Sequence, residues 1–78
     1  MNIQWHYTKD NDYPQIFGKY ETQHYPQIPC LVEDPWGYGI RYWNVTEQCW
    51  DDEACDDFYC KKDEVIRWLY LDSLIEKN

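Results

Sequence analysis

The tetrapeptide Asp34-Pro35-Trp36-Gly37 constrains the fold of this 78-residue chain more than any other feature. Asp at the first position, Pro at the second and Gly at the fourth suit a type I turn, with Gly37 left-handed in a bulge. Apolar residues flank the turn on both sides, in residues 30–33 and 39–43. The pattern therefore predicts a β-hairpin with Trp36 exposed at its tip.

Weaker patterns predict further strands on either side of this hairpin. Apolar and polar residues alternate over residues 3–8, which is typical of a half-buried strand. Residues 17–22 suit a second short strand, and residues 49–50 begin another. The apolar run at residues 64–69 has a β-branched start and favours a closing strand, after which residues 72–77 suit one helical turn.

The length of the chain limits it to one small domain, residues 1–78. We therefore expect a mainly β (or α+β) fold: a twisted antiparallel sheet of four to five strands with at most a short C-terminal helical turn. Aliphatic residues are few, whereas five Trp, eight Tyr and two Phe are present. So small a core cannot bury all these rings, and exposed Trp and Tyr are typical of binding hot spots.

The segment 47–64 concentrates charge and thiols, because it holds eight carboxylates and three of the four cysteines. The sequence predicts that it is an acidic loop between two strands. A solvated loop is the simplest interpretation. A calcium site would need alternating oxygen ligands and a turn glycine, which this segment lacks. The third interpretation is a docking surface for an Arg/Lys-rich groove, with carboxylates in place of phosphates and rings in place of bases.

This third interpretation predicts a partner-binding surface made of acidic and aromatic side chains. Its members are Trp36, Tyr38, Trp50, Asp51, Asp52, Glu53, Asp56, Asp57, Phe58 and Tyr59. The formal net charge of −8 favours a basic protein surface as the partner and argues against direct binding to nucleic acid or to an anionic membrane. The oligomeric state stays open.

The cysteines suggest an alternative, a zinc- or disulfide-stabilised structural module. Cys49, Cys55 and Cys60 are separated by five and four residues, whereas structural zinc usually needs a C-x2–4-C knuckle. His6, His24 or Cys30 would have to complete such a site. We therefore expect reduced, partly buried thiols that contribute to packing, and no cofactor.

No catalytic motif is present. His6 and His24 are far apart in the sequence, and alternation places His6 on a polar, solvated strand face. Ser73 is the only serine, so a Ser/His/Asp set is not credible, and we expect no enzyme. The chain starts without a basic, apolar leader and has no run of transmembrane length, which predicts a cytoplasmic location.

A resemblance rests on residues 28–44, IPCLVEDPWGYGIRYWN, followed by Trp50 and then by DEVIRWLYL. This pattern resembles the short phage and prophage proteins of the domain of unknown function 551 type. The segments that match in order are Trp5, residues 13–14, 30–32 and 38–43, Trp50 and residues 65–68. Residues 69–72 replace the proline-rich tail of that family, and the acidic, cysteine-containing segment is not one of its hallmarks.

The resemblance implies a compact antiparallel sheet and a phage or mobile-element origin, and it supplies no catalytic residues. Together with the charge and the surplus of rings, it predicts an acidic binding protein that inhibits or modulates a host protein. The target would handle nucleic acid or act in defence, as for an anti-CRISPR-like inhibitor or a nucleic-acid mimic that blocks a basic groove. The protein would then act in the cytoplasm of a bacterial host.

Overall fold

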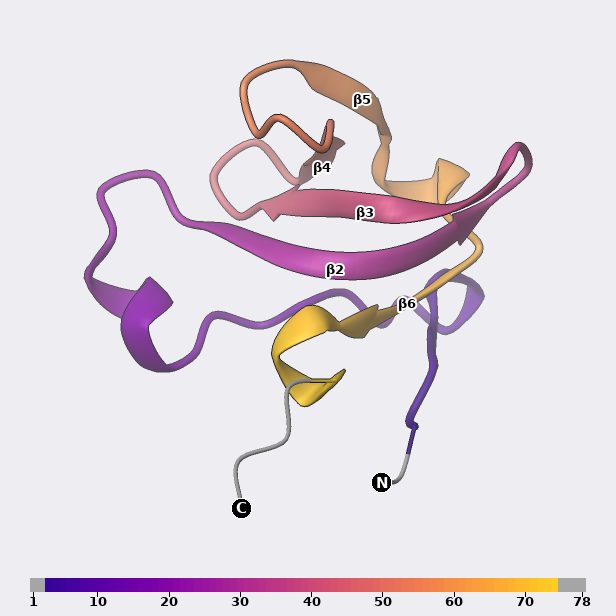
Figure 1. Ribbon diagram of the computed structural model, residues 1–78, viewed down its shortest axis with the longest axis horizontal. Helices are drawn as coiled ribbons and strands as arrows, with labels where there is room; N and C mark the ends of the chain where they lie inside the picture. The colour runs from indigo at the N-terminus through magenta and orange to yellow at the C-terminus, as the bar shows by residue number, and fades with distance from the viewer. Residues whose placement is uncertain (1–2, 75–78) are drawn as a thin grey trace.

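The computed structural model describes residues 3–74 and contains one antiparallel sheet of six strands (Figure 1). The strands are β1 (His6–Tyr7), β2 (Gln27–Asp34), β3 (Gly37–Asn44), β4 (Cys49–Asp51), β5 (Phe58–Lys61) and β6 (Arg67–Tyr70). Four 3-10 helices accompany them: η1 (Thr8–Asp10), η2 (Gly18–Thr22), η3 (Lys62–Glu64) and η4 (Leu71–Leu74). The predicted antiparallel, mainly β fold is confirmed, but the number of strands is larger than expected. The helical turn begins at Leu71, and residues 75–77 of the predicted turn lie outside the described part of the chain.

The predicted hairpin is confirmed and forms the centre of the sheet. Strands β2 and β3 pair from Gln27 opposite Asn44 to Asp34 opposite Gly37, which has a positive φ of 134°. The Asp34 carboxylate accepts a hydrogen bond from the Trp36 backbone N–H at 2.9 Å, which is a local Asx contact that favours the turn. Trp36 stands at the tip with 72% of its surface exposed.

The remaining strands flank the hairpin in the order β1-β6-β2-β3-β4-β5. Strand β6 lies between β1 and β2, so that Trp68 is opposite both His6 and Val32. On the other side, Trp50 of β4 is opposite Trp43 of β3. Paired residues share a face of the sheet, so the register places three tryptophans on the same face.

These three tryptophans make up most of the core. Trp43, Trp50 and Trp68 are each at most 1% exposed, and the ring centroids of Trp43 and Trp50 are 4.9 Å apart. Burial of a large apolar side chain contributes about 1.5–3 kcal/mol. The core cluster is completed by Tyr20, Ile28, Cys30, Val32, Cys60 and Val65.

The N-terminal segment covers this face of the sheet. Tyr13 stacks on Trp43 at 5.2 Å and His6 stacks on Trp68 at 4.3 Å between ring centroids. The Trp68 indole N–H donates to the Asp12 carbonyl at 2.7 Å. The expectation that His6 is solvated was wrong, because its ring is half-buried and its Nδ1 lies 2.8 Å from an Asp12 carboxylate oxygen.

Two further predictions of local structure were wrong. Residues 17–22 do not form a strand: Gly18 has a positive φ of 53°, and the chain turns into η2 with Tyr20 buried. The segment 47–64 is not one loop, because it contains β4, β5 and η3. The tertiary reason is that Cys60 lies opposite Trp50, so both side chains join the core. At the last residue of β5, the Lys61 backbone N–H donates to the Glu64 carboxylate at 2.8 Å.

Candidate functional site

The acidic loop, defined here as residues 52–57, connects β4 to β5 and is closed by its own hydrogen bonds. The Asp52 N–H donates to the Asp57 carbonyl at 2.8 Å, and the Cys55 N–H donates to the Asp52 carbonyl at 2.9 Å. The Asp52 carboxylate accepts from the backbone N–H of Ala54 at 3.1 Å. Cys55 has a positive φ of 65°. The loop is therefore a compact turn built around Asp52.

Asp51 anchors this loop to the sheet. Its side chain is buried, and its Oδ2 atom accepts hydrogen bonds from Gln27 Nε2 at 2.6 Å and from Asn44 Nδ2 at 2.9 Å. The same Gln27 amide reaches the Cys55 carbonyl at 3.3 Å. A buried carboxylate is tolerated only where donors of this kind replace water. The acidic loop is consequently fixed to the ends of β2 and β3 that lie away from the hairpin tip.

The carboxylates of the loop are close together and uncompensated. Asp52, Asp56 and Asp57 each offer an oxygen atom within 4.8 Å of the others, and Glu53 beside them is exposed. Within residues 3–74 the ion pairs are His6–Asp12 and Arg67–Glu33, so no described Lys, Arg or His pairs with these groups. Like charges about 4 Å apart repel by about 1 kcal/mol even in water. The loop is therefore a local concentration of negative charge.

Two residues predicted to bind a partner are not accessible. Trp50 is fully buried in the core and Asp51 is only 6% exposed, so both assignments were wrong. Their positions have one cause: pairing of β4 with β3 turns Trp50 onto the core face, and alternation then turns Asp51 onto the other face. There Gln27 and Asn44 hold it. Sequence reasoning missed these two amides because only the register of β2 and β3 brings them to Asp51.

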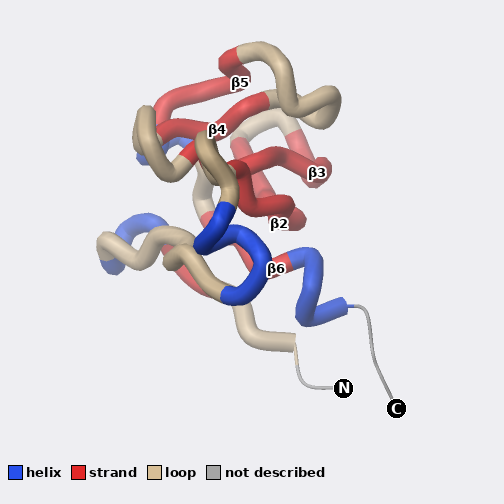
Figure 2. Tube along the Cα trace, turned by 90° about the vertical axis from the view of Figure 1, so that its left-hand side faces the viewer, coloured by secondary structure: helices blue, strands red, loops and turns tan. Residues whose placement is uncertain are grey.

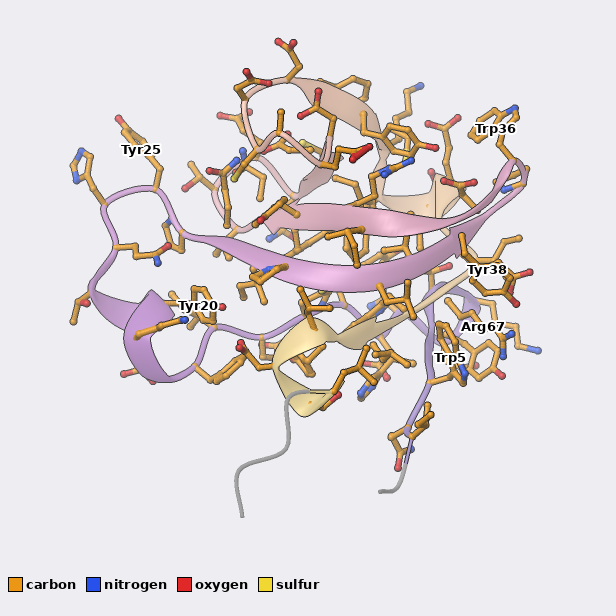
Figure 3. All side chains as sticks on the ribbon, in the orientation of Figure 1. Trp5, Tyr20, Tyr25, Trp36, Tyr38 and Arg67 are labelled. Carbon is orange, nitrogen blue, oxygen red and sulfur yellow. The ribbon has the colours of Figure 1, made fainter. Side chains whose placement is uncertain are left out.

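The predicted aromatic members do not form one surface with the loop. Phe58 follows the loop directly and is 60% exposed. Trp36 and Tyr38 are exposed as well, but they lie at the hairpin end of the sheet, away from the loop (Figure 3). Tyr59 is half-buried, and its hydroxyl donates to the Asp34 carboxylate at 2.6 Å. The structure thus brings together five of the ten predicted residues, namely Asp52, Glu53, Asp56, Asp57 and Phe58. The other five are buried or lie elsewhere on the sheet.

A second cluster, which the sequence did not predict, surrounds Arg67. Its guanidinium lies 4.1 Å from the centroid of the Trp5 ring, its Nε donates to Glu33 at 2.7 Å, and its Nη2 donates to the Tyr38 hydroxyl at 2.8 Å (Figure 3). Hydrogen bonds to Tyr38 and Glu33 raise the pKa of Arg67 above its usual range. This cluster fastens the N-terminal segment to the sheet, and it engages the Tyr38 side chain.

The cysteines are free thiols held in the protonated form. Burial raises the pKa of Cys60 to about 12 and raises the pKa of Cys30 as well. Cys49 and Cys55 are half-buried, and burial together with the Asp51 charge raises the pKa of both. Within residues 3–74, the group of three or more adjacent metal-ligating side chains is the Asp52, Asp56 and Asp57 set. Cys49, Cys55 and Cys60 form no such group. The arrangement therefore gives no support to a zinc module.

No helix within residues 3–74 has the length and hydrophobicity that a membrane crossing requires. The likeness to the phage family stays a prediction that rests on short motifs. No protein-family model, curated protein or solved structure matches this chain.

Proposed function

We propose that this protein uses its acidic loop to bind a basic, nucleic-acid-binding groove on another protein and so blocks that groove. The observation that carries the proposal is the cluster of Asp52, Asp56 and Asp57, whose carboxylate oxygens lie within 4.8 Å of one another. No described residue forms an ion pair with them. Repulsion among these carboxylates is unfavourable in the free protein, and cationic side chains of a partner would relieve it.

Three properties support nucleic-acid mimicry. Duplex DNA carries one negative charge per about 1.7 Å of its axis, so a groove that binds it presents closely spaced Lys and Arg side chains. The acidic loop offers closely spaced carboxylates on a backbone that Asp51 holds in place. Phe58 adds an exposed ring that can take the place of a base, because such grooves stack bases on aromatic side chains. The net charge of −8 would accelerate the approach to a positive surface.

The proposed partner is a host protein that handles nucleic acid or acts in defence, and the proposed setting is the cytoplasm of a bacterial host. These two points follow from the resemblance to phage proteins. The action requires neither a catalytic group nor a cofactor, because occupancy of the groove is sufficient for inhibition. The protein would therefore act in proportion to its concentration and would be displaced by the nucleic acid that it imitates.

The test compares two variants with the same change of net charge. The loop variant carries Asp52→Asn, Asp56→Asn and Asp57→Asn, and the amide introduced by the first change keeps an acceptor for the hydrogen bonds inside the loop. The control variant neutralises three exposed acids elsewhere: Asp10→Asn, Glu21→Gln and Asp63→Asn. Proteins captured from a bacterial lysate by the wild type are identified, and their nucleic-acid binding is then measured by fluorescence polarisation with each variant added.

We expect the wild type and the control variant to inhibit nucleic-acid binding, and the loop variant to inhibit at least tenfold more weakly with a smaller salt dependence. Equal losses in both variants would show that total charge matters and that the acidic loop does not. Capture of a partner whose nucleic-acid binding is unaffected by the wild type would remove the blocking role.

A further inference from the structure

A hollow lies across the β2–β3 hairpin from the strand that follows the acidic loop. It has a volume of about 450 Å³ and opens between the segment that precedes η2 and the residues of β6 and η4. In both views η4 lies on the other side of the β2–β3 hairpin from β5 (Figures 1 and 2). The residues that line the hollow are Gln15, Ile16, Phe17, Tyr70, Asp72 and Ser73.

The walls of the hollow are apolar and aromatic. Ile16 and Phe17 remain 41% and 37% exposed, and the Phe17 ring meets the Tyr70 ring edge to face at 5.2 Å. Elsewhere in residues 3–74, a Lys or Arg lies over six aromatic rings, including that of Tyr20, but none lies over Phe17 or Tyr70. The face of an aromatic ring attracts a cation. These two rings therefore line a space that no described cation of the chain occupies.

Asp72 lines this hollow, and one of its two carboxylate oxygens has no described partner. Its Oδ2 atom accepts a hydrogen bond from the Tyr20 hydroxyl at 2.9 Å, whereas its Oδ1 atom has no hydrogen bond or ion pair within residues 3–74. Two neutral polar groups of the hollow already have partners: the Tyr70 hydroxyl accepts from the Gln15 N–H at 2.8 Å, and the Ser73 hydroxyl donates to the Tyr70 carbonyl at 2.6 Å. Asp72 is thus the charged group that remains for a ligand.

We propose that this hollow binds a small organic cation, with its ammonium group at Asp72 and its apolar body against Ile16, Phe17 and Tyr70. A carboxylate beside aromatic rings is complementary to a positive charge, and an anion would be repelled. A neutral ligand would cover the carboxylate without replacing the water that solvates it. The volume suits a small molecule, since pockets of roughly 300–1,000 Å³ hold ligands of that size. This site shares no residue with the acidic loop, so it does not depend on the proposed function.

A second hollow provides a natural comparison. It is lined by Tyr7, Lys9, Asp63 and Ile66, among others, and it also combines a ring with a carboxylate. There the Lys9 ammonium already lies 5.8 Å from the centroid of the Tyr7 ring. The chain thus supplies its own cation at this second hollow, and Asp63→Asn is a matched control for substitutions at Asp72.

The test is a pair of titrations followed by amide NMR. Phenethylammonium and 2-phenylethanol have the same shape but differ in charge. We expect the ammonium compound to shift the amide signals of Gln15, Phe17 and Ser73 and to bind about tenfold more tightly than the alcohol. Asp72→Asn, which keeps an acceptor for the Tyr20 hydroxyl, should abolish that preference, while Asp63→Asn should retain it.

Three results would overturn the assignment. The first is equal affinity for the ammonium compound and the alcohol, because charge would then contribute nothing. The second is an unchanged preference in Asp72→Asn, or amide shifts confined to residues 52–57, which would indicate non-specific attraction to the most acidic surface. The third is tighter binding of N-acetyl-lysine amide than of phenethylammonium, which would assign the hollow to a lysine side chain of a protein partner.

Discussion

Replacement of Asp51 by alanine tests whether one buried carboxylate holds the acidic loop in place. The substitution removes the acceptor of the Gln27 and Asn44 amides, which lie 2.6 and 2.9 Å from Oδ2. A hydrogen bond to a charged acceptor contributes about 1.5–3 kcal/mol, so the two bonds together contribute about 3–6 kcal/mol. Removal of a buried charge offsets part of this loss of stability, because burial of an ion is itself unfavourable. We therefore expect Asp51→Ala to lower the free energy of unfolding by about 2–4 kcal/mol.

The assay is urea denaturation followed by tryptophan fluorescence, together with hydrogen exchange at the Cys55 amide. A domain of this length has about 4–12 kcal/mol of stability, so the variant should stay folded unless the wild type lies at the bottom of that range. The matched control is Glu53→Ala in the same loop, which is exposed and lies outside the Asp52, Asp56 and Asp57 cluster, so it should change stability by no more than about 0.5 kcal/mol. Asp51 does not anchor the loop if Asp51→Ala is as stable as the control, or if exchange at Cys55 stays at the wild-type rate.

Three further predictions concern the core, the pH dependence and the thiols. Trp50→Ala should lower the free energy of unfolding by about 3–5 kcal/mol in the same denaturation assay. Trp36→Ala, at a position 72% exposed, should lower it by less than about 0.5 kcal/mol. Similar losses in the two variants would contradict the packing. Burial raises the pKa of Tyr20 from 10.0 and of Cys60 from 9.0 to about 12 each, so both groups stabilise the fold while neutral. Stability should therefore be retained below about pH 9 and should fall as the pH rises toward 12, and denaturation curves that are flat or improve over that range would disprove this. A disulfide reagent such as Ellman's should label half-buried Cys49 before buried Cys60 in native protein, and the reverse order by mass spectrometry of digested protein would be inconsistent with the fold.

The central hairpin could be predicted because its signals are local. The turn needs only four adjacent residues. Pro35 and Gly37 each favour the backbone conformation that their position in the turn requires. The exposure of Trp36 followed from the same turn. Residues 17–22 show the opposite case: their sequence reads like a short strand, but Gly18 takes a positive φ and Tyr20 finds its partner at Asp72, far along the chain. Local patterns hold no information on such a partner.

The candidate site was predicted in outline, but its members could not be sorted into buried and exposed. Alternation alone places Trp50 and Asp51 on opposite faces of a strand. Which of the two faces becomes the core depends on the partner strand, and the edge-on contact of the Trp50 ring with the Trp43 ring across β3 and β4 decides it. Asp51 then needs polar partners, and it finds Gln27 at a sequence distance of 24 residues. Side chains in the loop that make no such long-range contact, such as Asp56, are exposed, as the charge pattern predicted.

The hydrogen bond from the Lys61 N–H to the Glu64 carboxylate affects how readily two copies of this protein associate through their sheet edges. Strand β5 is the last strand on its side of the sheet, and an open strand edge offers backbone groups to which another chain can add. Glu64 already accepts a donor of this edge, and β1 at the far edge is only two residues long. Growth of the sheet by addition of strands is thereby discouraged at both ends. We therefore expect this chain, although rich in aromatic side chains, to form extended β-aggregates slowly.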